Sequence, residues 1–193
     1  MSNVITRSEP RADLPRFGPK FSGGLTSVHS VSTKQTQSLA SQLAKKILAR
    51  EPRAGALVLA LTGDLGSGKT TFIQGLAKGL GIRARIASPT FVIMRKFQIP
   101  RNKKRTNSKF QISKFKTFKK FYHFDCYRLQ KPEEILELGW REILADPKNI
   151  MAIEWPERIK KFLPKETNHL NFKFIDKNQR EIRIGKTAIF MVK

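Results

Sequence analysis

The stretch of sequence that decides the fold is Gly63-Asp64-Leu65-Gly66-Ser67-Gly68-Lys69-Thr70. It matches the phosphate-binding pattern G-x-x-x-x-G-K-[ST] at every fixed position. The glycines allow the backbone to curl so that successive N–H groups point at phosphate oxygens. Lys69 would reach the β- and γ-phosphates of ATP, and the hydroxyl of Thr70 would bind Mg²⁺. The candidate nucleotide-binding residues here are Asp64, Leu65, Gly66, Ser67, Gly68, Lys69, Thr70 and Thr71.

The residues on either side of this loop provide the context that a phosphate-binding loop requires. Residues 56–61 form a continuous apolar run of strand length, which is typical of a parallel strand buried on both faces. After the loop, apolar residues recur at helical spacing at Phe72, Ile73, Leu76, Ala77 and Leu80. A strand, a glycine loop and a helix in this order predict an α/β fold, the three-layer P-loop NTPase sandwich with a mostly parallel central sheet.

The rest of the chain is predicted to form one domain, residues 26–193. Residues 1–25 are rich in Pro and Gly and are expected to be a disordered extension. A helix is predicted over 33–49, capped by Ser32 and Gln35, and another begins at Pro132. Strands are expected within 84–97 and over 121–129, 150–153, 169–175, 181–184 and 188–192, and a short helix over 156–162.

Composition limits the possible partners and compartments. The formal net charge is +23 and the pI about 10.6, which favours polyanionic partners, with nucleic acid first; a basic composition without such a partner is the alternative. The single cysteine, Cys126, excludes a disulfide framework, so we expect a cytoplasmic protein. No apolar run is long enough to span a bilayer, and the scattered histidines offer no zinc-ligand spacing.

Two acids are candidates for the chemistry opposite the phosphate loop. Glu154 ends a buried apolar strand, the position of the second acid of P-loop proteins, and Asp125 ends another strand-like segment. Because ligands of parallel α/β sheets collect at the carboxyl ends of the strands, both acids would converge on the triphosphate. Asp125 and Glu154 are therefore the candidate catalytic residues, and Thr70 and Glu154 the candidate metal ligands. A helix N-cap for Asp125 and a surface position for Glu154 remain the alternatives.

Several other residues have weaker signals. Ser88-Pro89-Thr90 could sense the γ-phosphate through its hydroxyls or could be a plain turn. Trp155 could stack near the nucleotide or pack in the core. Cys126 lies between aromatic residues and is expected to be a buried, inert thiol. The three histidines have no partner at catalytic spacing, and no role is assigned to them.

Four stretches occur in an order and spacing that resemble one family. They are residues 63–72, Ser88-Pro89-Thr90-Phe91, His123-Phe124-Asp125-Cys126-Tyr127-Arg128-Leu129 and Ile153-Glu154-Trp155-Pro156-Glu157-Arg158. Together they resemble the TsaE (YjeE) family, bacterial ATPases of the tRNA threonylcarbamoyladenosine pathway. The resemblance extends from about Ser27 to Ile184. Ser67 stands where the family usually has alanine, and Cys126 where it usually has leucine.

The resemblance implies a function and a role for each matched residue. The protein would bind and slowly hydrolyse ATP while attached to TsaD and TsaB, which modify the adenosine beside the anticodon of tRNA. Mg²⁺ would lie on Thr70 and Glu154, and Asp125 would orient or deprotonate the attacking water. Thr90 would lie in the switch segment and Trp155 near the nucleotide.

Two questions stay open at the level of sequence. A small-molecule or nucleoside kinase on the same core is the alternative function, whereas a GTP switch is disfavoured because no Asn-Lys-x-Asp segment is present. Residues 95–121 form a basic insertion with eleven Lys or Arg, no acid and interleaved Phe. Bases of tRNA could stack there while cations contact phosphates. A solvated loop is the simpler interpretation, and we favour it.

Overall fold

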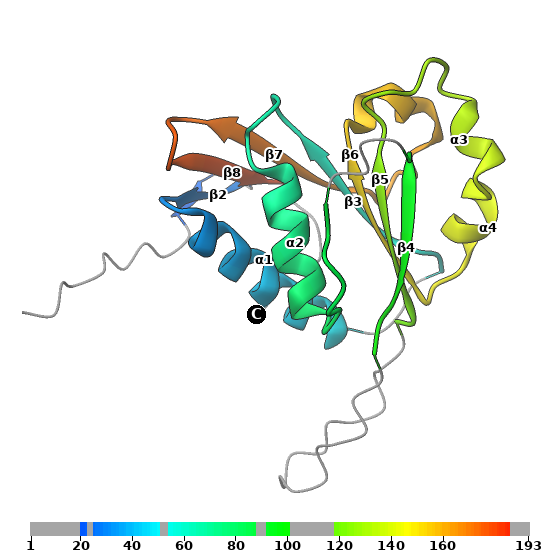
Figure 1. Cartoon of the computed structure of the whole chain (residues 1–193), viewed down its shortest axis with the longest axis horizontal. Helices are drawn as coiled ribbons and strands as arrows, with labels where there is room; N and C mark the ends of the chain where they lie inside the picture. The colour runs from blue at the N-terminus through cyan, green and yellow to red at the C-terminus, as the bar shows by residue number, and fades with distance from the viewer. Residues whose placement is uncertain (1–19, 23–24, 51–53, 88–91, 101–117, 186–193) are drawn as a thin grey trace, which may run out of the picture.

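A computed structural model of the chain describes residues 20–22, 25–50, 54–87, 92–100 and 118–185 (Figure 1). Its strands are β1 (Lys20–Ser22), β2 (Leu25–Ser30), β3 (Leu57–Thr62), β4 (Met94–Gln98), β5 (Lys120–Asp125), β6 (Asn149–Glu154), β7 (Asn168–Phe174) and β8 (Arg180–Ile184). Its helices are α1 (Thr33–Leu48), α2 (Lys69–Gly79), α3 (Glu134–Glu137), α4 (Trp140–Ala145) and the 3₁₀ helix η1 (Pro156–Phe162).

The strands of the described residues form one mixed sheet in the order β1-β2-β8-β7-β3-β6-β5-β4. Its centre, β7-β3-β6-β5, is parallel throughout, and β3 lies between β7 and β6. The pairings outside this centre are antiparallel on both sides. The predicted α/β P-loop architecture is confirmed, with the parallel strands at the centre and hairpin-like pairings toward both edges.

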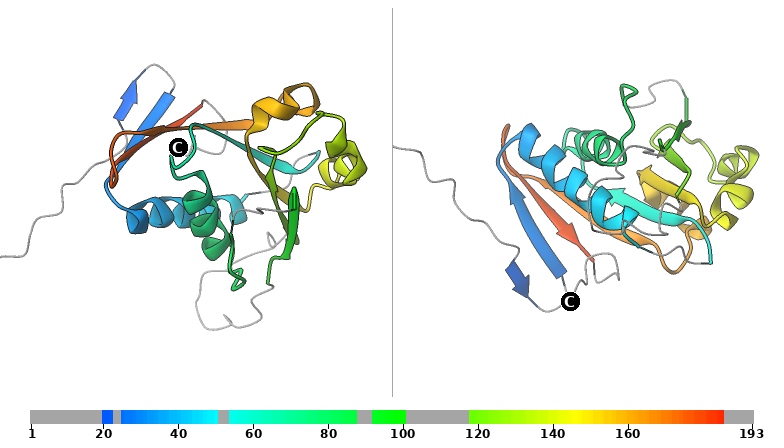
Figure 2. Two further views of the ribbon diagram at one scale, coloured as in Figure 1. Left: turned by 45° about the horizontal axis from the view of Figure 1, so that its top comes forward. Right: turned by 90° about the horizontal axis from the view of Figure 1, so that it is seen from below.

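Helices cover the sheet on both faces, which gives the three predicted layers (Figures 1 and 2). On one face, α1 and α2 bury a core with Leu59 and Leu61 of β3 and Phe172 of β7. On the other face, α3, α4 and η1 pack on Val58 of β3 and Met151 of β6. The side chains of β3 and β6 are thus apolar on both faces, as expected for central parallel strands.

The two long helices approach each other unusually closely. A Cβ at position 75 of α2 would lie 2.3 Å from the backbone oxygen of Gln37 in α1, and one at position 79 would lie 2.6 Å from the backbone oxygen of Ser41. Any side chain at these positions would push the helices apart. Gly75 and Gly79 therefore determine how closely α1 packs against α2, and hence how α2 sits on the sheet.

The predicted elements are found with some differences. Ser32 caps α1 as expected, since its hydroxyl accepts a hydrogen bond from the Gln35 amide at 3.1 Å. The helix expected from Pro132 is two short helices, because Gly139 takes a left-handed φ of 72° between α3 and α4. Strand β2 was not predicted. The strand expected over 188–192 lies outside the described residues.

The predicted domain limits are only partly within the described chain. Of the proposed extension 1–25, the structure describes residues 20–22 and 25, which lie in strands β1 and β2. Of the basic insertion 95–121, residues 101–117 are outside the described part. The chain leaves β4 and returns to β5 at adjacent positions, because the Ile99 amide donates to the Lys119 oxygen at 2.9 Å. No helix among the described residues has the length and apolar character needed to cross a membrane.

Candidate functional site

The phosphate-binding loop lies where the sequence places it, between the end of β3 and the first residue of α2. Gly68 precedes α2 with φ 99° and ψ 15°, a left-handed conformation that residues with a side chain adopt only with strain. The loop is partly open to solvent, with Asp64, Leu65 and Gly66 exposed. Ser67 is buried, and its hydroxyl has no hydrogen-bond partner in the described part of the chain. The first N–H groups of any helix have no partner within it, so those that begin α2 are available to an anion at the loop.

A buried arginine supports the loop from behind. Arg180 of β8 is only 6% exposed, and its Nη1 donates to the hydroxyl of Thr36 in α1 at 3.2 Å. A Cβ at position 68 would lie 3.0 Å from Cδ of Arg180. The arginine therefore fills the space behind Gly68 and connects the loop to β8 and α1. No sequence signal pointed to this residue, because its contacts are made across distant segments.

Lys69 is folded against its own loop. Its Nζ donates to the backbone oxygens of Gly63 at 2.5 Å and Asp64 at 2.9 Å, and it lies 4.1 Å from the ring centroid of Trp155. Burial lowers the pKa of Lys69 from its ordinary value, and nearby carboxylates, chiefly Glu154, oppose that shift. The ammonium group is thus held in a partly desolvated position beside the loop, where a phosphate would compete with two carbonyl oxygens for it.

The two predicted metal ligands meet in the structure. The hydroxyl of Thr70 donates to Glu154, at 3.0 Å from Oε1 and 3.1 Å from Oε2. Leu61 of β3 lies opposite Glu154 of β6 in the parallel register. Glu154 therefore ends its strand beside the loop that leads from β3 to Thr70. Glu154 is 3% exposed, so the alternative of a surface acid is wrong.

A histidine completes this cluster, although the sequence alone led to no role for it. Nε2 of His123 lies 2.9 Å from Oε1 of Glu154, and the His123 side chain is fully buried. Its Nδ1 has no hydrogen-bond partner among the described residues. His123 lies on β5 beside β6, two residues before Asp125. A histidine between two aromatic residues in the middle of a strand, two positions before its terminal acid, was the signal that could have pointed to it.

Asp125 ends β5 directly opposite Glu154 in the parallel register. Its Oδ1 accepts a hydrogen bond from the Tyr127 amide at 3.2 Å, which fixes the turn after the strand. This turn is not a helix start, so the N-cap alternative does not apply. Asp125, Glu154, Lys69 and Thr70 all line one cavity of about 690 Å³ beside the loop, a volume typical of ligand sites.

Trp155 forms part of the wall of this cavity. It has φ 56°, the only positive φ of a non-glycine residue in the described chain. A left-handed conformation at such a residue costs roughly 1–2 kcal/mol, so the surrounding contacts must hold it. Its ring contacts that of Tyr127, with centroids 4.9 Å apart. Trp155 is half-buried at the site, whereas Thr90 lies outside the described residues.

The comparisons with known proteins agree with this geometry. The profile of the family described as "Threonylcarbamoyl adenosine biosynthesis protein TsaE" matches residues 30–182. The chain belongs to the TsaE family. The resemblance stated from the four sequence stretches is therefore confirmed.

Several TsaE relatives and one solved structure support this assignment. The tRNA threonylcarbamoyladenosine biosynthesis protein TsaE of Rickettsia prowazekii is 36% identical over 156 residues, which cover 80% of this chain and 91% of the relative. The protein of the same name from Haemophilus influenzae is 31% identical over 134 residues, 69% of this chain and 73% of the relative. The crystal structure of Bacillus subtilis YdiB matches with a TM-score of 0.53 and 25% identity, covering 83% of this chain and 84% of YdiB.

Cys126 of this TsaE-family chain is a buried thiol, as expected. It is fully buried next to Asp125, and its backbone amide donates to the backbone carbonyl oxygen of Glu154 at 3.0 Å. Burial, and to a smaller extent the neighbouring carboxylates, raise its pKa to about 12. Both its burial and its raised pKa disfavour the thiolate, as expected for an inert thiol.

Proposed function

We propose that this TsaE-family chain binds ATP with Mg²⁺ and hydrolyses it. It does so together with homologues of TsaD and TsaB, in the threonylcarbamoyl modification of the adenosine beside the anticodon of tRNA. The observation that supports the chemistry most directly is the meeting of Thr70 with Glu154 beside Lys69 in one cavity. The biological role rests on the family, because the family model and the matched relatives carry the name of this pathway.

The residues present fit a magnesium ion by their chemistry. The Thr70 hydroxyl and the two carboxylate oxygens of Glu154 are hard oxygen donors that already lie within hydrogen-bond distance. A bound ion would neutralise charge on the phosphates. His123 donates to Glu154 when Nε2 carries the proton, which leaves the carboxylate oriented toward Thr70.

The other residues of the cavity bind the phosphates, activate the attacking water and contact the nucleotide. Lys69 binds the β- and γ-phosphates with a charge-assisted hydrogen bond, and the N–H groups of the loop hold the phosphate oxygens. Asp125, across the cavity, orients or deprotonates the water that attacks the γ-phosphate. Trp155 borders the nucleotide. Asp125 ends β5, whereas the phosphate-binding loop lies between β3 and α2. Removing the Asp125 carboxylate should therefore impair hydrolysis while leaving ATP binding intact.

The test compares Asp125→Asn with the unaltered chain, alone and with purified TsaD and TsaB homologues. We expect ATP hydrolysis to rise when the partners are added. In the complex, Asp125→Asn should lower the hydrolysis rate by roughly 10²–10⁴-fold, with ATP affinity changed little. Lys69→Ala should instead weaken ATP binding itself, by about 10-fold or more.

Two results would contradict the proposal. Hydrolysis by Asp125→Asn at the unaltered rate within the complex would refute the role of that residue. Transfer of the γ-phosphate to a small acceptor, rather than release of inorganic phosphate, would favour the alternative of a kinase.

A further inference from the structure

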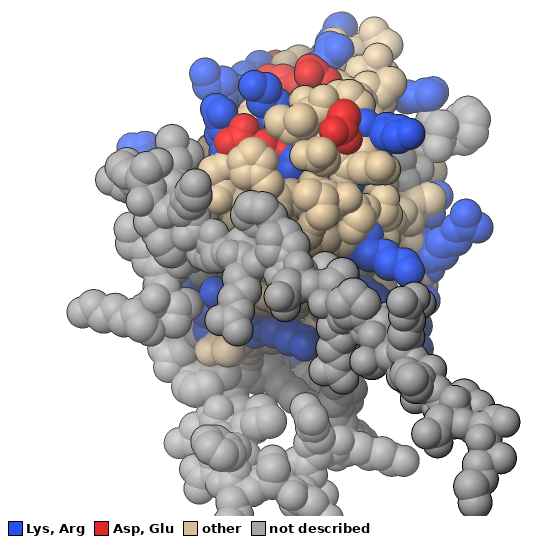
Figure 3. Space-filling model, turned by 90° about the vertical axis from the view of Figure 1, so that its left-hand side faces the viewer, with Lys and Arg blue, Asp and Glu red and all other residues tan. Residues whose placement is uncertain are grey.

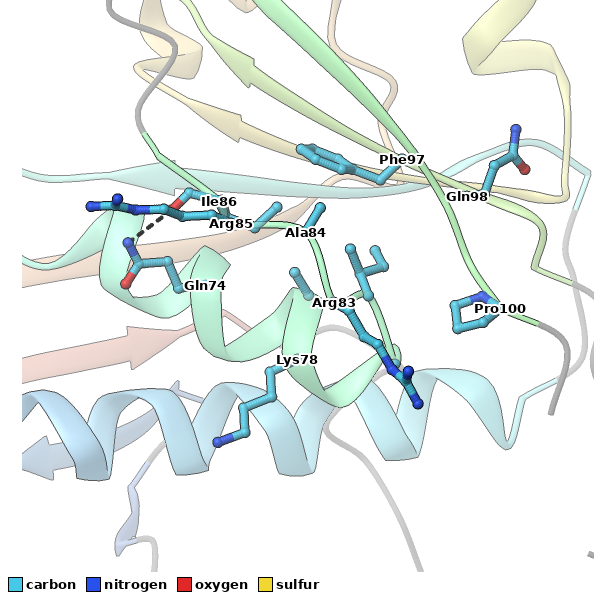
Figure 4. A pocket seen from close by; sticks show the side chains of 12 residues that line it. Gln74, Lys78, Arg83, Ala84, Arg85, Ile86, Phe97, Gln98 and Pro100 are labelled. Atoms are coloured by element: carbon cyan, nitrogen blue, oxygen red, sulfur yellow. Dashed lines mark hydrogen bonds between the residues drawn. The ribbon is translucent and has the colours of Figure 1, made fainter. Parts of the chain in front are cut away.

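A second concavity lies away from the nucleotide cavity, between the end of α2 and strand β4. It has a volume of about 1190 Å³ and is lined by the loop 81–87 on one side and by the end of β4 on the other. Figure 4 shows Arg83 and Arg85 on the loop, and Phe97, Gln98 and Pro100 along β4 and just after it. We name it the α2–β4 groove.

The charge of this groove differs from that of the nucleotide cavity. Lys78, Arg83 and Arg85 line it, and no acid is among its described lining residues. The nucleotide cavity, by contrast, contains Asp125 and Glu154. Basic side chains are also spread over the face shown in Figure 3, where acids gather toward the top, so net charge alone does not single out the groove. The distinctive feature is a concavity lined by cations without a compensating carboxylate.

The two arginines lack a local explanation. Lys78 lies in the last turn of α2, where a cation stabilises the helix dipole. Arg83 and Arg85 are exposed, and neither forms an ion pair with another residue in the described part of the chain. Guanidinium groups bind phosphate oxygens in a planar, two-pronged geometry, which makes an unpaired arginine a good phosphate ligand.

The loop that carries these arginines is held in place. Ile82 and Ile86, on either side of them, are buried in the core against α2. The Gln74 side chain donates to the Ile86 oxygen at 3.0 Å, shown dashed in Figure 4. At the other end, a Cβ on Gly81 would lie 3.1 Å from Cγ of Pro100, so the loop closes against the end of β4. The groove is therefore preformed by fixed backbone.

The arrangement of the cations favours a polymer over a small phosphate compound. In Figure 4, the side chains of Arg83 and Arg85 extend away from each other along the loop. A single phosphate group would need converging donors, whereas successive phosphates of a nucleic acid strand could contact separated ones. Across the groove, the half-buried ring of Phe97 on β4 adds an apolar surface to its lining.

From these observations we infer that the α2–β4 groove binds the phosphate backbone of RNA, through Arg83 and Arg85. The inference rests on the proposed function for the kind of RNA, which would be the tRNA substrate. It places an RNA contact on residues that the structure describes, outside residues 101–117 of the basic insertion.

The experiment compares two double variants of the full chain. Arg83→Glu/Arg85→Glu alters the groove, and Lys165→Glu/Lys177→Glu alters two exposed lysines elsewhere. Both variants replace two cations with two carboxylates, so their net charges are equal. Binding of a fluorescent, unmodified tRNA transcript is measured by anisotropy from 50 to 200 mM KCl. ATP binding to each variant verifies that the domain is folded.

We expect the groove variant to bind tRNA at least about tenfold more weakly at 50 mM KCl, and the control to stay within about twofold of the unaltered chain. The slope of log affinity against log salt should decrease by about 0.7–0.9 for each phosphate that the variant no longer neutralises. Arg83→Lys/Arg85→Lys, which keeps both charges, should recover most of the affinity.

Equal tRNA affinity and salt slope in the groove variant and the unaltered chain would overturn the inference. So would an equal loss in the groove and control variants, because net charge alone would then explain the binding. If the chain fails to hydrolyse ATP with its partners, the proposed function fails, but the comparison of tRNA affinities still decides this inference.

Discussion

At the scale of single residues, the end of β6 gathers side chains that are far apart in the sequence. Thr70 and Glu154 could be predicted, because one belongs to a recognisable motif and the other ends an apolar strand. The position of His123 in β5 leaves a signal in the sequence, but its partner could not be predicted, because the hydrogen bond to Glu154 depends on the register of β5 against β6. Arg180 was missed for the same reason. Motifs identify the residues that are predicted to contact the phosphates, whereas the residues that position them follow from the folded register.

His123 should influence metal-dependent binding specifically. His123→Leu removes the partner of Glu154, so we expect the affinity for Mg²⁺-ATP to fall by about 10–100-fold, as is typical when a group that orients a metal ligand is removed. Affinity for ATP in EDTA should change little. His123→Gln, whose amide can donate from a similar position, should restore much of the affinity. Isothermal titration with and without Mg²⁺ measures both; an equal decrease under the two conditions would indicate a purely structural role.

At the scale of elements, the predictable parts were those with strong apolar patterns. Strands β3 and β6 are buried on both faces and appear in the sequence as apolar runs. Strand β2, with the sequence Leu-Thr-Ser-Val-His-Ser, has no such run, and its pairing with β8 comes from the far end of the chain. The break at Gly139 was also missed, since the apolar spacing continues across it. Long-range pairing and single left-handed residues leave little trace in local periodicity.

The packing of α1 on α2 gives a prediction in which two effects oppose each other. In an isolated helix, Gly75→Ala would stabilise by about 1 kcal/mol. Here the new Cβ would lie 2.3 Å from the Gln37 oxygen, and overpacking typically costs about 1–3 kcal/mol. We therefore expect a net loss of stability in urea unfolding. Gly185→Ala, whose Cβ would have only an ordinary contact at 3.6 Å, is the control and should change stability little. A more stable Gly75→Ala protein would mean that the helices can separate freely.

At the scale of the whole molecule, charge is the dominant feature. The chain has 38 Lys or Arg against 15 Asp or Glu, so there are too few acids to pair with the cations. The ion pairs of Lys161 with Glu133 and of Arg183 with Glu181 lie at the surface, where such contacts contribute little to stability. The folded chain therefore carries a self-repulsion that its own acids do not compensate.

Salt should stabilise this protein. At low salt, repulsion among the like charges destabilises the compact state. Raising NaCl from about 20 to about 300 mM shortens the screening length and so weakens this repulsion. The melting temperature should increase, by roughly 2–4 °C for each kcal/mol gained in a chain of this size. Thermal unfolding followed by circular dichroism measures the effect. A melting temperature that falls with salt would show that favourable ion pairs outweigh the repulsion.

The adjacency of Ile99 and Lys119 has an evolutionary consequence. Because the chain leaves β4 and enters β5 at hydrogen-bonded positions, the sheet does not depend on how many residues lie between them. Doubling the length of a flexible connection costs only about 0.6 kcal/mol in closure entropy. Insertions and deletions can therefore accumulate at this point across a lineage while strands β4 and β5 stay unchanged. The same junction would accept a fluorescent domain or an affinity tag, and lineages could gain or lose new binding segments there without rebuilding the fold.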